Sequence, residues 1–177
     1  MTTQQLLLMM GVYSVQLVVV IYFTRPTARR LTGALVGGVA IGFMLLGIMA
    51  LANTLGLWRV PFASTPYFLP LLYLVIVISD APIYLITWRV ARRCGWIGLV
   101  VFLAGVAVIG PLRDYQVAAA FPEWMVIAPG IAPALAIAVT YVAIVAVGHG
   151  LMRWVAGPAR GDLLAPRPHS PKQTISR

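Results

Sequence analysis

The chain has 177 residues, of which 61% are hydrophobic, only 10% carry a charge, and the formal net charge is +9. A soluble domain usually has about 25% charged residues because its surface must be polar, so this composition excludes that class and predicts an integral membrane protein whose partner is a lipid bilayer. The basic residues lie at the ends of apolar runs, where they act as topology signals and not as a nucleic-acid surface, so no nucleic-acid partner is expected.

Five apolar runs follow one another along the chain, and each is long enough to cross a hydrocarbon core of about 30 Å as a helix. The first run has no basic segment before it and no small-residue cleavage site after it, so it is predicted to remain as a helix. We therefore predict an all-α, single-domain bundle over residues 1–156 and a disordered basic cytoplasmic tail at 157–177. The five expected transmembrane helices cover residues 6–23, 31–53, 67–88, 95–112 and 131–152.

The basic residues predict which end of this bundle faces the cytoplasm. Three arginines follow the first run, three follow the third, and five basic residues follow the last. The other two connections contain only Arg59 and Arg113. The positive-inside rule then places the N-terminus outside and the C-terminus in the cytoplasm. The arginine-rich, alanine-rich composition suggests a bacterial source, and hence a multi-pass protein of a bacterial inner membrane.

Glycines gather in the second apolar run. They form two pairs with a spacing of four residues, Gly33 with Gly37 and Gly38 with Gly42. Small residues at this spacing let two helix backbones approach closely in lipid. The pattern predicts a helix-packing face, used either within one bundle or to form a homo-oligomer or a larger membrane complex.

Asp80 is the sharpest chemical signal in the chain. It lies nine residues before Arg89, which is about 13 Å along a helix and places it near the bilayer midplane. An ionised carboxylate there costs at least about 2.5–3.5 kcal/mol, so Asp80 is expected to face the bundle interior. Tyr73, Tyr84 and Thr87 share its helical face and extend it into a polar stripe.

Pro82 lies two residues after Asp80 and cannot donate a backbone hydrogen bond to the carbonyl of Ile78. A helix kink with a freed carbonyl is therefore expected at the depth of the carboxylate. Together the two groups could bind a proton or a cation, or satisfy each other as static polar contacts.

Two further polar residues are expected near this stripe. Gln16 lies nine residues before Arg25, so it should be level with Asp80 and able to donate to it. His149, four residues before the cytoplasmic Arg153, is the only histidine in an apolar run. It would either help a proton to leave or be a satisfied residue at a helix end.

The connection 113–130 holds three of the few charges expected outside, Arg113, Asp114 and Glu123. They would pair with one another, contact a partner or a solute, or simply be solvated. Residues 114–121 read as a short interfacial helix that Pro122 and its neighbours end.

These features lead to one functional expectation and two alternatives. The leading one is proton- or cation-linked transport or permeation of a small solute through Asp80. The first alternative is a non-catalytic accessory or assembly subunit of a larger membrane complex. A membrane enzyme is the weaker alternative, because Ser79 and His149 differ by about 9 Å in expected depth. No catalytic residue, metal site or cofactor is predicted.

Overall fold

The computed structural model describes residues 2–61 and 67–158, and 84% of these are helical. The described residues form four helices, α1 (Thr3–Thr24), α2 (Ala28–Thr54), α3 (Phe68–Ala120) and α4 (Ile131–Ala156). Two strands of two residues each, β1 (Trp58–Arg59) and β2 (Val126–Ile127), pair antiparallel as a small ribbon. The all-α prediction is confirmed, whereas most of the predicted disordered tail lies outside the described residues.

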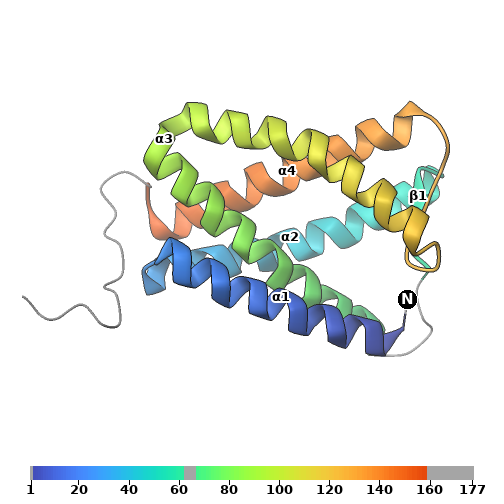
Figure 1. The fold of residues 1–177 in the computed structure, drawn as a ribbon, viewed down its shortest axis with the longest axis horizontal. Helices are drawn as coiled ribbons and strands as arrows, with labels where there is room; N and C mark the ends of the chain where they lie inside the picture. The colour runs from blue at the N-terminus through green and yellow to red at the C-terminus, as the bar shows by residue number, and fades with distance from the viewer. Residues whose placement is uncertain (1, 62–66, 159–177) are drawn as a thin grey trace, which may run out of the picture.

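The 53 residues of α3 contain both the third and the fourth apolar runs. Its backbone leaves helical geometry at Gly95, where φ is 67° and ψ is −154°, a conformation that is essentially restricted to glycine. Figure 1 shows the resulting elbow, from which a first arm (68–94) and a second arm (96–120) diverge. The described chain thus has four helices where the sequence predicted five, because helical hydrogen bonding continues through the expected 89–94 connection and one glycine makes the turn.

The second arm also corrects the expectation of a separate interfacial helix at 114–121. Residues 114–120 continue α3 without interruption, and a turn at 122–124 follows. By continuing the helix, these residues pair their backbone N–H and C=O groups within α3, so they do not need to form a separate helix.

Side-chain caps start the first two helices. The Thr2 hydroxyl accepts a hydrogen bond from the backbone N–H of Gln5, and the Gln5 side chain accepts one from the backbone N–H of Thr2. Thr27 caps α2 by accepting from the backbone N–H of Arg30. These bonds satisfy N–H groups that have no partner within a helix. The chain therefore needs only residues 25–27 to turn from α1 into α2.

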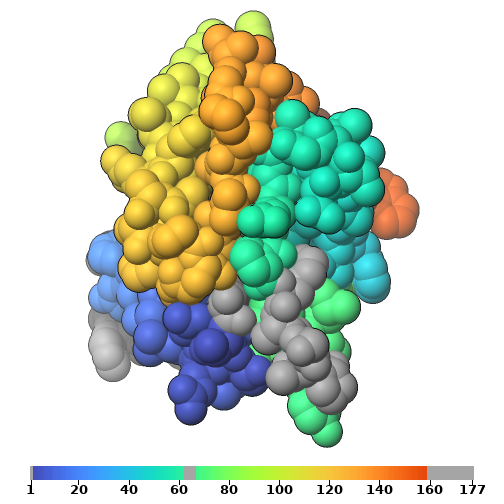
Figure 2. Space-filling model, turned by 90° about the vertical axis from the view of Figure 1, so that its right-hand side faces the viewer, coloured from blue at the N-terminus to red at the C-terminus, as the bar shows by residue number. Residues whose placement is uncertain are grey.

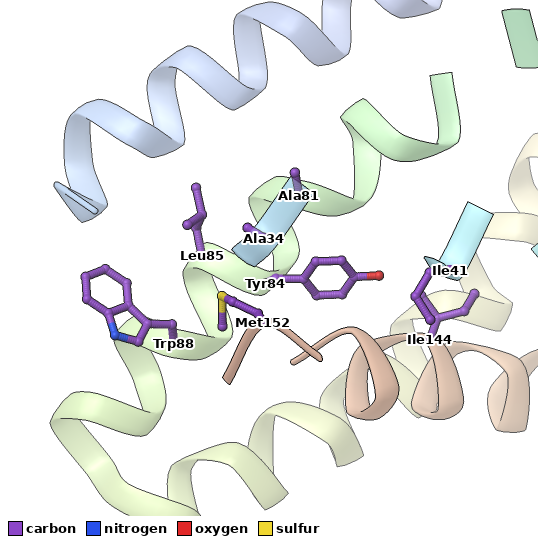
Figure 3. Close-up of a cluster of buried hydrophobic side chains, with 8 residues drawn as sticks. All are labelled: Ala34, Ile41, Ala81, Tyr84, Leu85, Trp88, Ile144 and Met152. Atoms are coloured by element: carbon purple, nitrogen blue, oxygen red, sulfur yellow. The ribbon is translucent and has the colours of Figure 1, made fainter. Parts of the chain in front are cut away.

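The four helices pack around one core. α2 lies against α3 and α4, and α1 lies against α3. Figure 3 shows the central cluster, in which aliphatic and aromatic side chains from α2, α3 and α4 meet. Its buried members are Ala34, Ile41, Ala81, Tyr84, Leu85, Trp88, Ile144 and Met152.

The outer faces of the bundle are apolar. Leu8, Phe43 and Val139 are 70%, 67% and 68% exposed. All four described helices are long and apolar enough to cross a membrane. Surface of this kind suits lipid and not water.

The two ends of the bundle differ in charge. The elbow end is formed by the end of α1, the start of α2, the α3 elbow and the end of α4, and it collects seven of the nine arginines in the described chain. The ribbon end carries Arg59 and Arg113. Figure 2 looks onto the ribbon end, where the start of α4 lies between the second arm of α3 and the segment that follows α2.

Candidate functional site

Asp80 lies on the first arm of α3 and is 8% exposed, so its carboxyl group is inside the bundle, as expected. It follows Val77 by one turn and precedes Tyr84 by one turn, and both of these side chains contact α2. Its Oδ2 atom is buried and has no hydrogen-bond partner among the described residues. A buried carboxyl oxygen without a donor is a costly feature that calls for a functional explanation.

Tyr84 is fully buried next to Asp80, and its ring lies between α2 and α4 (Figure 3). It fits there because Gly37 on α2 and Gly148 on α4 have no side chains, and a Cβ atom at either position would meet the ring. The Tyr84 hydroxyl is close enough to the Asp80 carboxyl for the two groups to interact electrostatically. No hydrogen bond of good geometry to a described residue satisfies that hydroxyl.

Thr87 continues the polar face of α3 and connects it to His149 on α4. The Thr87 hydroxyl donates to the backbone carbonyl of Tyr84, with an O···O distance of 2.9 Å. The same oxygen lies 2.9 Å from Nδ1 of His149. When the hydroxyl donates its one proton to Tyr84, Nδ1–H of His149 donates to Thr87, and Nε2 is then the unprotonated nitrogen of a neutral ring.

A cavity of about 340 Å³ lies beyond His149, at the elbow end. Its wall includes the elbow itself, the last turns of α4 and Arg30 from α2. Asp80, Tyr84 and Thr87 are spaced i, i+4 and i+7, so they extend about 10 Å along one helical face toward this end. His149 lines this cavity and is bonded to Thr87, and Asp80 and Tyr84 lie on the same face of α3 within two turns before Thr87; we call these four residues the Asp80–His149 line.

Arg30 is the residue that sequence reasoning missed, since it was assigned only as a topology charge. It is 1% exposed and donates to the carbonyl oxygens of Gly157 at 2.9 Å and Pro158 at 3.2 Å. Its guanidinium group also lies 5.4 Å from the centre of the Trp88 ring, a cation–π arrangement. Residues 157–158, the first two of the predicted tail, are therefore bound to the bundle. Nothing in the sequence distinguishes the role of Arg30 from that of its neighbour Arg29.

Two members of the expected site lie elsewhere. The Tyr73 hydroxyl donates to the backbone carbonyl of Val39 at 2.9 Å, so it joins α3 to α2. Gln16 is exposed on α1 and is not the expected partner of Asp80. Its neighbour Leu17 takes the inward position, because the packed face of α1 runs through Tyr13, Leu17 and Val20.

The four paired glycines of α2 face neighbouring helices within the bundle, whereas Gly47 is exposed. A Cβ atom at Gly33 or Gly37 would lie 2.9 Å from a carbonyl oxygen of α4, and one at Gly38 would lie 2.8 Å from the carbonyl of Val77. A Cβ atom at Gly42 would meet the Tyr73 ring. The four glycines therefore give α2 its close approach to α3 and α4.

Pro82 is buried inside α3, which keeps helical backbone angles there and departs from them only at Gly95. Its missing N–H still leaves the Ile78 carbonyl without the usual helical donor. The Ile78 carbonyl is therefore an acceptor without its helical donor, inside a helix that continues past Pro82.

The charges at the ribbon end belong to a second polar group. Arg113 donates to the hydroxyls of Tyr13 at 3.0 Å and Tyr141 at 3.3 Å, and Tyr141 donates to Asp114 at 2.8 Å. This group ties together α1, the second arm of α3 and α4. Glu123 is exposed in the turn that follows α3. The role of Tyr141 was not foreseen, since an isolated tyrosine in an apolar run carries no distinguishing pattern.

Ser79 does not form the imagined pair with His149, because its hydroxyl donates to the carbonyl of Ile76 at 2.9 Å and His149 is bound to Thr87. No group of three His, Cys, Asp or Glu side chains within residues 2–61 and 67–158 is arranged to hold a metal ion. No protein-family model, curated protein or solved structure matches this chain. Function must therefore be inferred from the residues themselves.

Proposed function

We propose that the protein crosses a bacterial inner membrane five times, with the elbow end in the cytoplasm and the N-terminus outside. A helix of 53 residues would be about 80 Å long, far more than one crossing of about 30 Å requires. The elbow at Gly95 divides it into two arms that can each cross once. The seven described arginines at the elbow end support the cytoplasmic assignment of that end.

Within this topology, we propose proton-linked permeation of a small solute, with Asp80 as the group that takes up and releases the proton. The observation that carries this proposal is the buried Asp80 carboxyl group, whose Oδ2 atom makes no hydrogen bond of good geometry in the described chain although the Tyr84 hydroxyl lies beside the carboxyl group. The Asp80–His149 line supplies hydroxyl and imidazole groups toward the elbow end, and both types of group can pass a proton on.

A proton fits the site better than a metal cation. One carboxylate is a poor ligand set for a hard cation, which takes six or more oxygen ligands. A proton needs no such set of ligands.

The accessory-subunit alternative loses one of the features that suggested it. The glycines that suggested a self-association face are occupied by α3 and α4 of the same chain. No other described feature points specifically to a protein partner.

The test is proton flux into liposomes that contain the purified protein and an internal pH dye, with and without a membrane potential. Asp80→Asn keeps the shape and removes the titratable group, so flux should fall to the level of empty liposomes. Ser79→Ala is the matched control, because it changes the neighbouring residue but loses only a hydrogen bond to the local backbone. Unchanged flux in folded Asp80→Asn protein would refute the proposal.

A further inference from the structure

The two arms of α3 bring Asp80 and Arg113 to a similar depth in the bundle. Asp80 lies 15 residues before Gly95, and Arg113 lies 18 residues after it. The second arm returns from the elbow toward the ribbon end (Figure 1). If both arms have a similar tilt, the two positions therefore differ by only about 5 Å along the bundle. Arg89, on the same arm as Asp80, is farther away, at about 13 Å along the helix axis.

A hydrogen bond across the bundle brings the Arg113 side chain next to the first arm. Its guanidinium group donates to the hydroxyl of Tyr13 on α1 at 3.0 Å. Tyr13 packs against the buried cluster that α1 shares with the first arm, and Ile76 of this cluster precedes Asp80 by one turn. The guanidinium group is thus close enough to the Asp80 carboxyl for their charges to interact.

The hydrogen bonds of Arg113 do not neutralise its charge. Both groups to which it donates, the hydroxyls of Tyr13 and Tyr141, are neutral. Asp114, the next residue in the chain, is the other acidic group that interacts with Arg113. Its carboxylate accepts a hydrogen bond from Tyr141 at 2.8 Å. Asp80 and Asp114 are therefore the two candidates for an ionic partner of Arg113.

Asp80 has the greater need of such a partner. Release of a proton from Asp80 would leave an ionised carboxylate inside the bundle, which is costly unless an opposite charge lies nearby. A guanidinium group serves this purpose because it keeps its charge at any physiological pH. The Oδ2 atom of Asp80, which makes no hydrogen bond of good geometry in the described chain, is an oxygen that could accept from it.

We propose that Arg113 is the counter-charge of ionised Asp80, and that it reduces the cost of the carboxylate that proton release leaves behind. Arg113 would then be a positioning residue, which acts on the proton through Asp80. The pairing itself is a property of the two side chains, whereas its part in proton release rests on the proposed function.

The test is thermal melting of the full chain in detergent, in mildly alkaline buffer, where a paired carboxyl group is ionised. Arg113→Gln should lower the melting temperature, and adding Asp80→Asn should restore at least half of the loss, because the carboxylate that needs the counter-charge is gone. Adding Asp114→Asn instead should restore less. Arg59→Gln is the matched control and should melt as the wild type does, because Arg59 is the other described arginine of the ribbon end and is exposed on β1.

If Arg113→Gln alone does not fold, a folded double variant with Asp80→Asn is the same supporting result. In the liposome assay, Arg113→Lys keeps the charge and should keep most of the proton flux, whereas Arg113→Gln should lose about tenfold. Rescue of melting by Asp114→Asn instead of Asp80→Asn, or by neither, would overturn the proposal. Because melting needs no transport, absence of flux in the wild-type protein would refute the proposed function and not the pairing.

Discussion

Thr87 has one hydroxyl proton and two neighbours that could receive it. It lies 2.9 Å from the carbonyl of Tyr84 and 2.9 Å from the ring of His149. The carbonyl can only accept, whereas the imidazole can also donate, so the two bonds together select one histidine tautomer. In the proposed proton pathway Thr87 therefore positions His149, with Nε2 as the ring nitrogen that can accept a proton, and passes no proton to the carbonyl.

Thr87→Val therefore tests the role of the Thr87 hydroxyl in proton movement. The substitution keeps the shape of the side chain and leaves Nδ1–H of His149 buried without an acceptor, at a cost of about 1 kcal/mol. Proton flux should fall roughly tenfold, which corresponds to about 1.4 kcal/mol in the barrier. Thr87→Ser should restore the flux.

Thr140→Val provides the control for that experiment. Thr140 is a partly buried threonine of α4 whose hydroxyl donates only to the Ala136 carbonyl of its own helix, at 2.8 Å. It should keep wild-type flux in the same liposome assay. Equal loss of flux in both valine variants would mean that Thr87 has no specific part in proton movement.

At the scale of helices, packing depends on glycines that make room for a tyrosine. A Cβ atom at Gly148 would meet the Tyr84 ring, whereas one at Gly150, half a turn later, would meet nothing within 4 Å. Gly148→Ala should lower the free energy of unfolding by about 1–3 kcal/mol through overpacking. Gly150→Ala should be neutral or slightly stabilising, because alanine favours helices.

Thermal melting in detergent distinguishes these two variants. Adding Tyr84→Ala to Gly148→Ala should remove the clash, so the double variant should be less destabilised than the sum of the single ones. Additive effects would show that the ring and the glycine do not compete for the same space.

The elbow makes a second prediction for α3. A residue other than glycine at position 95 would have to adopt φ 67° and ψ −154°, a strained conformation that costs about 1–3 kcal/mol. Gly95→Ala should lower the melting temperature, and Gly105→Ala in the same helix, where a Cβ atom would meet nothing within 4 Å, should not. Equal melting of the two variants would argue against the elbow.

The sequence predicted the helices better than their connections and side-chain partners. Apolar runs are long and unambiguous, so the all-α class followed directly from them. The break between helices that we expected at 89–94 did not occur. Charged residues can lie within a helix as well as after its end, and here the helix continues through them to Gly95. The inward position of Asp80 followed from the cost of burying charge, but Gln16 was misplaced by one position because depth arguments do not define rotation about the helix axis.

At the scale of the whole molecule, the proposed orientation is open to a direct test with the single native cysteine. Cys94 is exposed at the elbow. A membrane-impermeant maleimide should therefore not label it in intact bacterial spheroplasts, and should label it once the membrane is disrupted. Leu55 is 62% exposed at the ribbon end, which faces the outside in the proposed orientation.

Leu55→Cys in a Cys94→Ser background should be labelled in intact spheroplasts. The reverse pattern for the two cysteines would invert the topology and with it the assignment of the cavity to the cytoplasmic side. Labelling of both from outside would be incompatible with a bundle that spans the membrane between its two ends.

The burial of Arg30 has a consequence for how the protein is made. Arg30 precedes its acceptor Gly157 by 127 residues, so the ribosome completes α2 long before the carbonyls that bind this guanidinium group exist. Until α4 has been inserted and has reached its place, the start of α2 carries a cation with no such acceptors. Chains that stop short of Gly157 would keep that exposed charge, which gives membrane quality control a feature by which to separate unfinished chains from finished ones.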